Sequence, residues 1–226
     1  MIWEDECYLL SKRKFRENAN IIQVFSKLRG KVSGLVYGGN SRKIRNYLQL
    51  SNKLFIIHNS KNDNKIGYFK TELVKPISPI YFNDKKRSAA LISLCSILNI
   101  LLPEAQPNKN IYISFEKFLN SIDLENWIIL YIFFELSLIK ALGYDPNLVE
   151  HKNKNSDNLS TKKIKIDTFT YEIPEFIISN IVPENISKNL IKKSLYFTRN
   201  IIQNRFYLPN NLPFPKVRVQ LENYFN

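Results

Sequence analysis

Cysteine and histidine are scarce in this chain, and their scarcity limits its chemistry. The 226 residues contain two cysteines, Cys7 and Cys95, and two histidines, His58 and His151. None of them has the spacing of a zinc site, a catalytic triad or a disulfide framework. We therefore expect no metal, no other cofactor and no enzymatic activity. Because disulfides are typical of oxidising compartments, the default is a reduced, cytoplasmic protein.

Glycine-rich phosphate loops and long apolar segments are also missing. The glycine pair Gly38-Gly39 fits neither a P-loop nor a G-x-G-x-x-G fingerprint. We expect the pair to take a positive φ at a barrel corner or to let another backbone approach closely. The longest run without charge, Ser88 to Pro103, has 16 residues, fewer than the roughly 18 of a spanning helix. With no signal peptide in "MIWEDECYLL", we expect no membrane segment.

Positive charge is abundant and unevenly distributed. The formal charge is +13; residues 1–75 carry 15 Lys+Arg against 6 acids, net +9, and residues 76–226 carry 18 against 14, net +4. An anionic partner, most often nucleic acid, is expected for the first third. The alternative is codon bias, because a chain crowded with Ile, Asn and Lys is typical of an AT-rich genome.

The first third has the pattern of a small β-barrel. Five short β-branched or aromatic segments lie between Cys7 and Leu73, and "NSRKIRNY" between the third and fourth fits a turn or short helix. Five strands with an insertion after the third are the outline of an OB-fold, with an SH3-like barrel as the main alternative.

The remainder has helical periodicity. We expect an α+β protein: an OB-fold β-barrel in residues 1–75, followed by an all-α helical domain in residues 80–226. Asp84 is a candidate N-cap, and Gly143 is the expected left-handed end of an apolar core helix. Residues 146–170 are polar and lack a period, so we expect a surface loop. The predicted helices cover residues 84–102, 111–121, 124–142, 174–181 and 185–206.

Basic residues in the first third are interleaved with aromatic ones. Ten cations lie between residues 11 and 46 with a single acid, Glu17, and Phe15, Tyr37, Tyr47, Phe55 and Tyr68 are the aromatic candidates. A cationic track with aromatic platforms is typical of single-strand binding, although each aromatic taken singly is more often a core residue. The candidate nucleic-acid-binding residues are Lys12, Arg13, Lys14, Arg16, Arg29, Lys31, Tyr37, Arg42, Lys43 and Arg45.

Several segments together resemble one protein family. "GKVSGLVYGGNSRKIRNYLQLSN" is similar to the third strand, corner and following turn of RecO, the bacterial recombination mediator, in its alphaproteobacterial form. The start "MIWEDECYLLSKRKFRENANIIQVFSKLRGK", the segment "IGYFKTEL", the helices "LISLCSILNILLPEAQP" and "WIILYIFFELSLIKALGYD", and the tail "RFYLPNNLPFPKVRVQL" extend the resemblance nearly end to end.

The resemblance implies a function and a set of partners. RecO-like proteins bind single- and double-stranded DNA, anneal complementary strands, contact the C-terminal tail of the single-stranded-DNA-binding protein, and act with RecR to load RecA. This implies a cytoplasmic, nucleoid-associated DNA-repair protein whose helical domain receives that tail. Many relatives carry a cysteine-based zinc module after the core helix; here His151 stands near the first expected cysteine, without partners. An RNA-binding OB-fold protein and a structural adaptor remain the alternatives.

Overall fold

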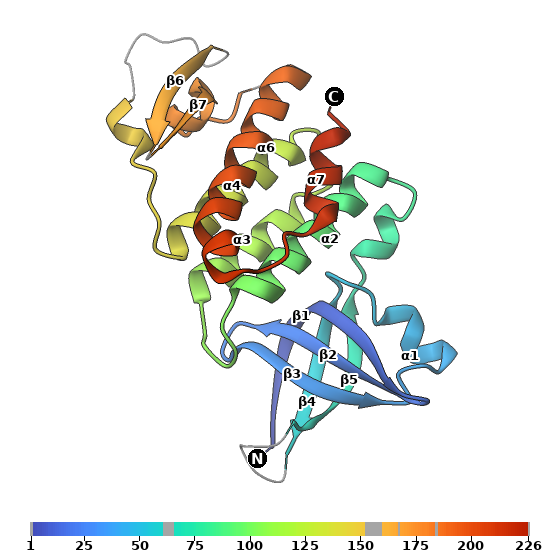
Figure 1. The fold of residues 1–226 in the computed structure, drawn as a ribbon. Coiled ribbons are helices and arrows are strands. Elements are labelled where there is room, and N and C mark those ends of the chain that lie inside the picture. Colours follow the sequence, from blue (N-terminus) through green and yellow to red (C-terminus); the bar gives the residue numbers. More distant parts are fainter. Residues whose placement is uncertain (1, 61–65, 152–159, 167, 184, 226) are drawn as a thin grey trace. The chain divides into compact units, whose positions relative to one another are not determined.

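The computed structural model describes residues 2–60, 66–151, 160–166, 168–183 and 185–225 (Figure 1). The chain forms two compact units, Met1–Ile113 and Ser114–Asn226. A five-stranded barrel comes first and helices follow, which confirms the predicted fold class. Within the described residues, no helix has both the length and the apolar character needed to cross a bilayer.

The barrel has the strand order of an OB-fold. Its order is β1-β2-β3-β5-β4, closed by pairing of β4 with β1, and β3 meets β5 in parallel at Leu35 and Tyr68. This order, with a helix between β3 and β4, selects the OB-fold over the SH3-like alternative. The elements are β1 Ile2–Arg16, β2 Ala19–Ser26, β3 Gly30–Tyr37, α1 Arg42–Tyr47, β4 Lys53–Asn59 and β5 Tyr68–Lys75.

Strand β1 closes the barrel because it is long and bends. Its first half pairs with β4 and its second half with β2, with register shifts between Leu9 and Ser11 and between Lys14 and Arg16. Such irregularities bend a strand and increase its twist. The apolar side chains of alternate residues then fill the interior, and the core consists of Cys7, Leu9, Ile22, Val24, Val36, Leu48, Leu54, Ile56 and Phe69.

The glycine pair turns the chain out of β3, as predicted. Gly38 has φ +69°, a conformation that costs glycine little. A Cβ on Gly39 would lie 2.4 Å from Asn20 Nδ2 and 3.2 Å from the carbonyl oxygen of Val36. The positive φ of Gly38 therefore turns the chain, and the absence of a side chain at Gly39 lets Asn20 and the backbone of Val36 lie close to it.

The helices of the first unit pack on β1. A 3-10 turn, Ser78–Tyr81, precedes α2, Lys85–Leu101. Asp84 caps α2 by accepting hydrogen bonds from the backbone N–H groups of Lys86 and Arg87, each at 3.0 Å. Cys95 is fully buried 3.7 Å from the carbonyl oxygen of Leu9, and burial raises the pKa of its thiol to about 12. It is a core residue. Helix α3, Lys109–Asn120, follows.

The second unit is built around α4, whose side chains are buried on nearly every side. Gly143, with φ +91°, ends this helix as predicted. The elements are α4 Trp127–Ala141, a 3-10 turn Leu148–His151, β6 Thr161–Ile166, β7 Phe169–Pro174, α5 Glu175–Ser179, α6 Lys188–Ile202, a π-helical turn Gln203–Tyr207, a 3-10 turn Leu208–Asn210 and α7 Lys216–Asn223.

The prediction of a polar loop over residues 146–170 was wrong in its last part. β6 and β7 form an antiparallel hairpin in which Ile164 and Ile166 are buried while Lys163 and Lys165 are exposed. This alternation is the period of a half-buried strand, and the surrounding lysines and asparagines obscured it. The helical domain is therefore not purely α-helical. The middle of the predicted loop, 152–159, lies outside the described residues.

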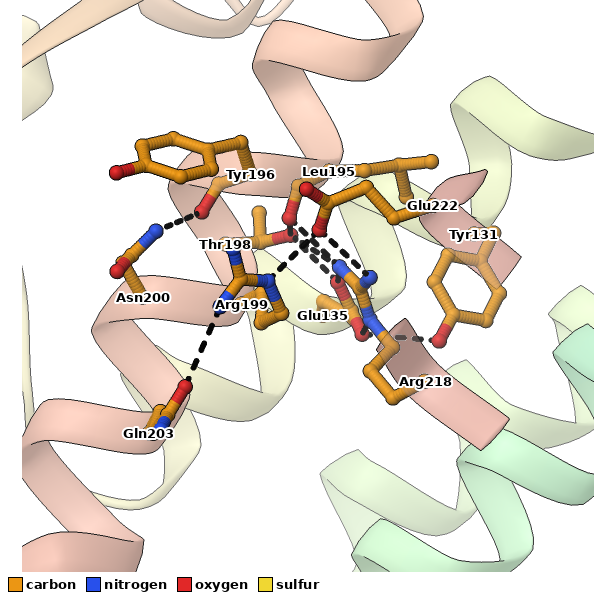
Figure 2. A network of polar contacts seen from close by, with 10 residues as sticks. All are labelled: Tyr131, Glu135, Leu195, Tyr196, Thr198, Arg199, Asn200, Gln203, Arg218 and Glu222. Atoms are coloured by element: carbon orange, nitrogen blue, oxygen red, sulfur yellow. Dashed lines mark hydrogen bonds and ion pairs between the residues drawn. The ribbon is translucent and has the colours of Figure 1, made fainter. Parts of the chain in front are cut away.

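A buried ion pair joins three helices of the second unit (Figure 2). Arg218 of α7 donates from Nε to Glu135 Oε1 at 2.6 Å and from Nη2 to Glu135 Oε2 at 2.8 Å. Tyr131 and Thr198 also donate to this carboxylate. Burying a carboxylate is costly unless it is paired and hydrogen-bonded, so the network fixes α4, α6 and α7 to one another. Helix α7 lies beyond residue 206, where the last predicted helix ends, and was not predicted.

Candidate nucleic-acid interface

The outer face of β1, β2 and β3 carries the candidate site. Residues paired across neighbouring strands project to the same face of a sheet, so the register defines rows of side chains. One row is Arg13, Ile21, Leu35 and Tyr68, and the next is Arg16, Ala19 and Tyr37. We call these two rows the open end.

The other end of this face is covered within the same unit. The rings of Tyr8 and Phe25 lie 5.5 and 5.4 Å from the ring of Tyr112 in α3. Between the covered and open ends, Glu104 accepts hydrogen bonds from Gln23 and Ser33. These contacts cover one end of the outer face, whereas Tyr37 and Tyr68 at the open end are exposed.

Aromatic rings are exposed at the open end. The side chains of Tyr37 and Tyr68 are 63% and 37% exposed, and their ring centroids are 6.3 Å apart. The guanidinium carbon of Arg16 lies 5.3 Å from the centroid of the Phe15 ring, which is also exposed. Exposed rings beside cations can stack nucleobases while the cations neutralise phosphates.

The turn between β1 and β2 brings α1 to the same end of the barrel. The backbone N–H of Gly38 donates to the carbonyl oxygen of Asn18 at 2.8 Å, and Asn40 Nδ2 donates to that of Glu17 at 2.7 Å. Helix α1 begins directly afterwards, with Ser41 as its N-cap, and Figure 1 shows it beside this turn. Six predicted residues are thus gathered and exposed at one end: Arg13, Lys14, Arg16, Arg42, Lys43 and Arg45.

Lys12 is half-buried beside this group. Its ammonium donates to the carbonyl oxygen of Leu48 at 2.7 Å. Burial, and then the positive charge of Arg45, lowers the pKa of Lys12. The positive charge of Arg45 in α1 therefore acts on Lys12 of β1, so the charges of these two elements interact.

Two predicted residues lie elsewhere. Lys31 is buried at the covered end, where it donates to the carbonyl oxygen of Asn99 at 2.8 Å and lies 3.8 Å from Glu104. Arg29 is exposed at the β2–β3 turn, at the opposite end of β3 from Tyr37, and stacks 4.5 Å from the ring centroid of Trp3.

The predicted aromatic residues also differ in exposure: Phe15, Tyr37 and Tyr68 are exposed, whereas Tyr47 and Phe55 are half-buried. Tyr47 is half-buried and donates its hydroxyl to the carbonyl oxygen of Thr71 at 2.6 Å. Phe55 is half-buried on β4. Tyr68, outside the predicted site residues, and the apolar floor of Ile21 and Leu35 join the site because β3 pairs with β5. The predicted OB-fold implies a closed barrel, but the register that places Tyr68 opposite Leu35 is non-local and could not be predicted from the sequence.

The histidines occupy different surroundings. His58 lies within β4 and stacks on Trp3 at 4.8 Å between centroids. Desolvation by burial, foremost, lowers its pKa. The carbonyl oxygen of His151 accepts from Lys162 Nζ at 2.7 Å. Among the described residues, no group of three or more His, Cys, Asp or Glu side chains could hold a metal ion.

The fold and this surface define a class: an OB-fold barrel with an open cationic and tyrosine-bearing face, followed by a helical unit. Two family models match, "Recombination protein O N terminal" over residues 1–77 and "Recombination protein O C terminal" over residues 83–167. The chain belongs to the RecO family, and the predicted resemblance is confirmed.

Individual relatives agree with the family models. A protein of Ehrlichia chaffeensis named DNA repair protein RecO is 30% identical over 77% of this chain and 73% of its own length. One of a Wolbachia species of Drosophila simulans, with the same name, is 27% identical over 96% and 98%. One of Cereibacter sphaeroides is 31% identical over 66% of this chain, a match that spans 62% of the relative.

Proposed function

We propose that the protein is a DNA-binding recombination mediator that anneals complementary single strands. The observation that carries the proposal is the open end, where one row runs from Arg13 to Tyr68 and the next from Arg16 to Tyr37, beside the cations of α1. Membership of the RecO family supports DNA as the ligand. The protein acts by holding strands and breaks no bond.

Phosphate neutralisation and stacking together supply the mechanism. Cations at the open end reduce the repulsion between two phosphate backbones that must approach each other, and they release condensed counterions as they bind. The tyrosine rings hold bases of one strand unpaired. Because a stacked base keeps its hydrogen-bonding edge exposed, a complementary strand can pair with it and lift it from the ring.

The partners follow from the family. We propose that the protein acts with RecR to help load RecA onto DNA coated by single-stranded-DNA-binding protein, in repair of gaps and breaks on nucleoid DNA in the cytoplasm. In this proposal residues 1–75 bind nucleic acid. Residues 80–226 bind the acidic, apolar tail of the single-stranded-DNA-binding protein. The modest positive balance of residues 76–226, 18 cations against 14 acids, supports that site. Photo-crosslinks from a tail peptide to residues 80–226 are expected; crosslinks confined to residues 1–75 would contradict it.

The DNA assignment is tested by competition on the full chain. A fluorescent single strand of DNA is bound, and unlabelled DNA or RNA of the same sequence and length displaces it at several salt concentrations. We expect DNA to compete at least as well as RNA, and the affinity to fall steeply with salt. Stronger displacement by RNA would assign the protein to RNA metabolism instead, and no binding at moderate salt would leave an adaptor whose charge reflects codon bias.

A further inference from the structure

A groove in the first unit lies beside the open end and has no role in the function proposed above. It consists of two adjoining cavities, of about 440 Å³ and about 710 Å³, that share Gln49 and Leu50. One wall is a single stripe of α2, formed by Ser88, Ile92, Ser96 and Asn99, because residues three and four apart lie on one side of a helix. The opposite wall is the segment 46–50, which leads out of α1.

The groove meets the candidate interface at Lys12. This residue lines the smaller cavity together with Asn99, and the charge of Arg45 acts on it. A strand whose phosphates lie on the cations of α1 and the end of β1 would therefore pass the mouth of the groove. At the other end of the groove, the ring of Phe82 is 83% exposed and lines the larger cavity.

The lining has the chemistry of a nucleobase site. Four side-chain amides, Asn46, Gln49, Asn83 and Asn99, line the two cavities, between apolar walls that include Leu50 and Ile92. An amide offers a donor and an acceptor side by side, which is what the edge of an unpaired base requires. An acidic peptide would need several cations, whereas Lys12 is the one cation among the described lining residues.

Among the described residues, no donor forms a hydrogen bond with the side-chain oxygen of Asn99. This oxygen, Oδ1, is buried. A buried acceptor without a donor costs about 1–3 kcal/mol. Asn99 also lines the smaller cavity, and the exocyclic amine of a base is the kind of donor that its side-chain oxygen lacks.

We propose that this groove receives unstacked bases of a single DNA strand bound at the open end, with Asn99 contacting a base edge and Phe82 stacking on a base. The proposal rests on the DNA-binding function proposed above. A duplex keeps its base edges paired and its bases stacked, so it cannot fill the groove. The groove therefore favours single strands over duplex, and an arriving complementary strand removes the bases from it.

The test compares an intact single strand with one of equal length that carries several abasic sites. Both have the same phosphates, so their difference in affinity for the full chain reports base contacts. We expect the intact strand to bind about tenfold tighter or more, as stacking of bases on aromatic side chains suggests. Asn99→Leu combined with Phe82→Ala should reduce this difference by weakening the intact strand, and the part of the difference due to stacking on Tyr37 and Tyr68 should remain. The matched control, Asn110→Leu with Phe169→Ala, changes an exposed amide and an exposed ring outside the groove and should retain it.

Each outcome decides the question. An undiminished difference in a correctly folded groove variant would overturn the groove proposal while leaving the DNA-binding function intact. Equal binding of the two strands by the unchanged protein would overturn the groove proposal and also the stacking role of Tyr37 and Tyr68, and would leave binding through phosphates alone. Failure to bind either strand would overturn that function itself. A 4-thiothymidine strand provides a second readout that needs no variant: crosslinks to the groove walls, residues 46–50 and 82–99, are expected, and crosslinks found only at the open end would contradict the proposal.

Discussion

Tyr37 and Tyr68 stand side by side at the open end of the barrel, with ring centroids 6.3 Å apart, although they belong to β3 and β5. The parallel pairing of Leu35 with Tyr68 brings them together. Both rings are exposed. Tyr68 lies in the row that begins with Arg13 of β1, and Tyr37 lies in the row that begins with Arg16. This arrangement combines a stacking surface with phosphate-binding groups.

Replacing both tyrosines by alanine should weaken single-strand binding more than duplex binding. Stacking is worth about 1–3 kcal/mol per base, so we expect a loss of tenfold or more for a single strand, measured by fluorescence anisotropy. Tyr37→Phe with Tyr68→Phe keeps the rings and should retain most of the affinity. Tyr196→Ala, at an exposed ring of the second unit, is the control. Equal losses for single strand and duplex would mean that the rings do not stack on bases.

Arg42→Ala with Arg45→Ala should weaken DNA binding and reduce its dependence on salt. Each phosphate contact on a single strand contributes about 0.7 to the slope of log affinity against log salt, so the double variant should flatten the slope by about 1.4. Lys109→Ala with Lys117→Ala removes the same charge from exposed positions on α3. If this control and the α1 variant flatten the slope equally, the effect comes from net charge and not from the proposed site.

Breaking the Glu135–Arg218 pair should destabilise the protein without touching the DNA interface. Arg218→Met leaves a carboxylate buried without its cation, which typically costs about 3–5 kcal/mol. Glu135→Gln combined with Arg218→Met removes the unpaired negative charge and keeps an acceptor for the hydroxyl groups of Tyr131 and Thr198. Urea unfolding should therefore show a smaller loss for the double variant than for Arg218→Met alone. A loss as large in the double variant would show that the charge is not the cause.

His58 should make stability depend on pH. Burial lowers its folded pKa below the ordinary value of 6.5, so between the two values the unfolded chain binds more protons. The stabilising contribution is complete above pH 6.5 and is lost as the pH falls below it. NMR titration of the folded protein should show a pKa below 6.5 for His58. In His58→Gln the loss of stability below pH 6.5 should shrink, and an unchanged pH profile would exclude His58 as its source.

Local features of this fold were predictable because neighbouring residues determine them. The Asp84 cap, the positive φ of Gly38 and the end of α4 at Gly143 depend on a few consecutive residues. The hairpin β6–β7 also has a local signal, the alternation of Ile164 and Ile166 with lysines. Its lysine-rich composition hid that signal.

The site itself depends on strand register, which the sequence does not provide. Arg13 and Lys31 lie in similar basic contexts, yet the register puts Arg13 at the open end and Lys31 at the covered end. A slip of one residue would exchange the two faces of a strand. Glu135 is a partial exception, because a carboxylate in an apolar helix requires a partner. Nothing in the sequence identified that partner as Arg218.

Strand annealing tests the central claim most directly. Two complementary oligonucleotides, each coated with single-stranded-DNA-binding protein, are mixed with the full chain, and duplex formation is followed across a salt series. The proposed function predicts faster annealing that fades as salt rises and that is reduced in the variant lacking Arg42 and Arg45. Annealing no faster than without the protein, at every salt concentration, would contradict it.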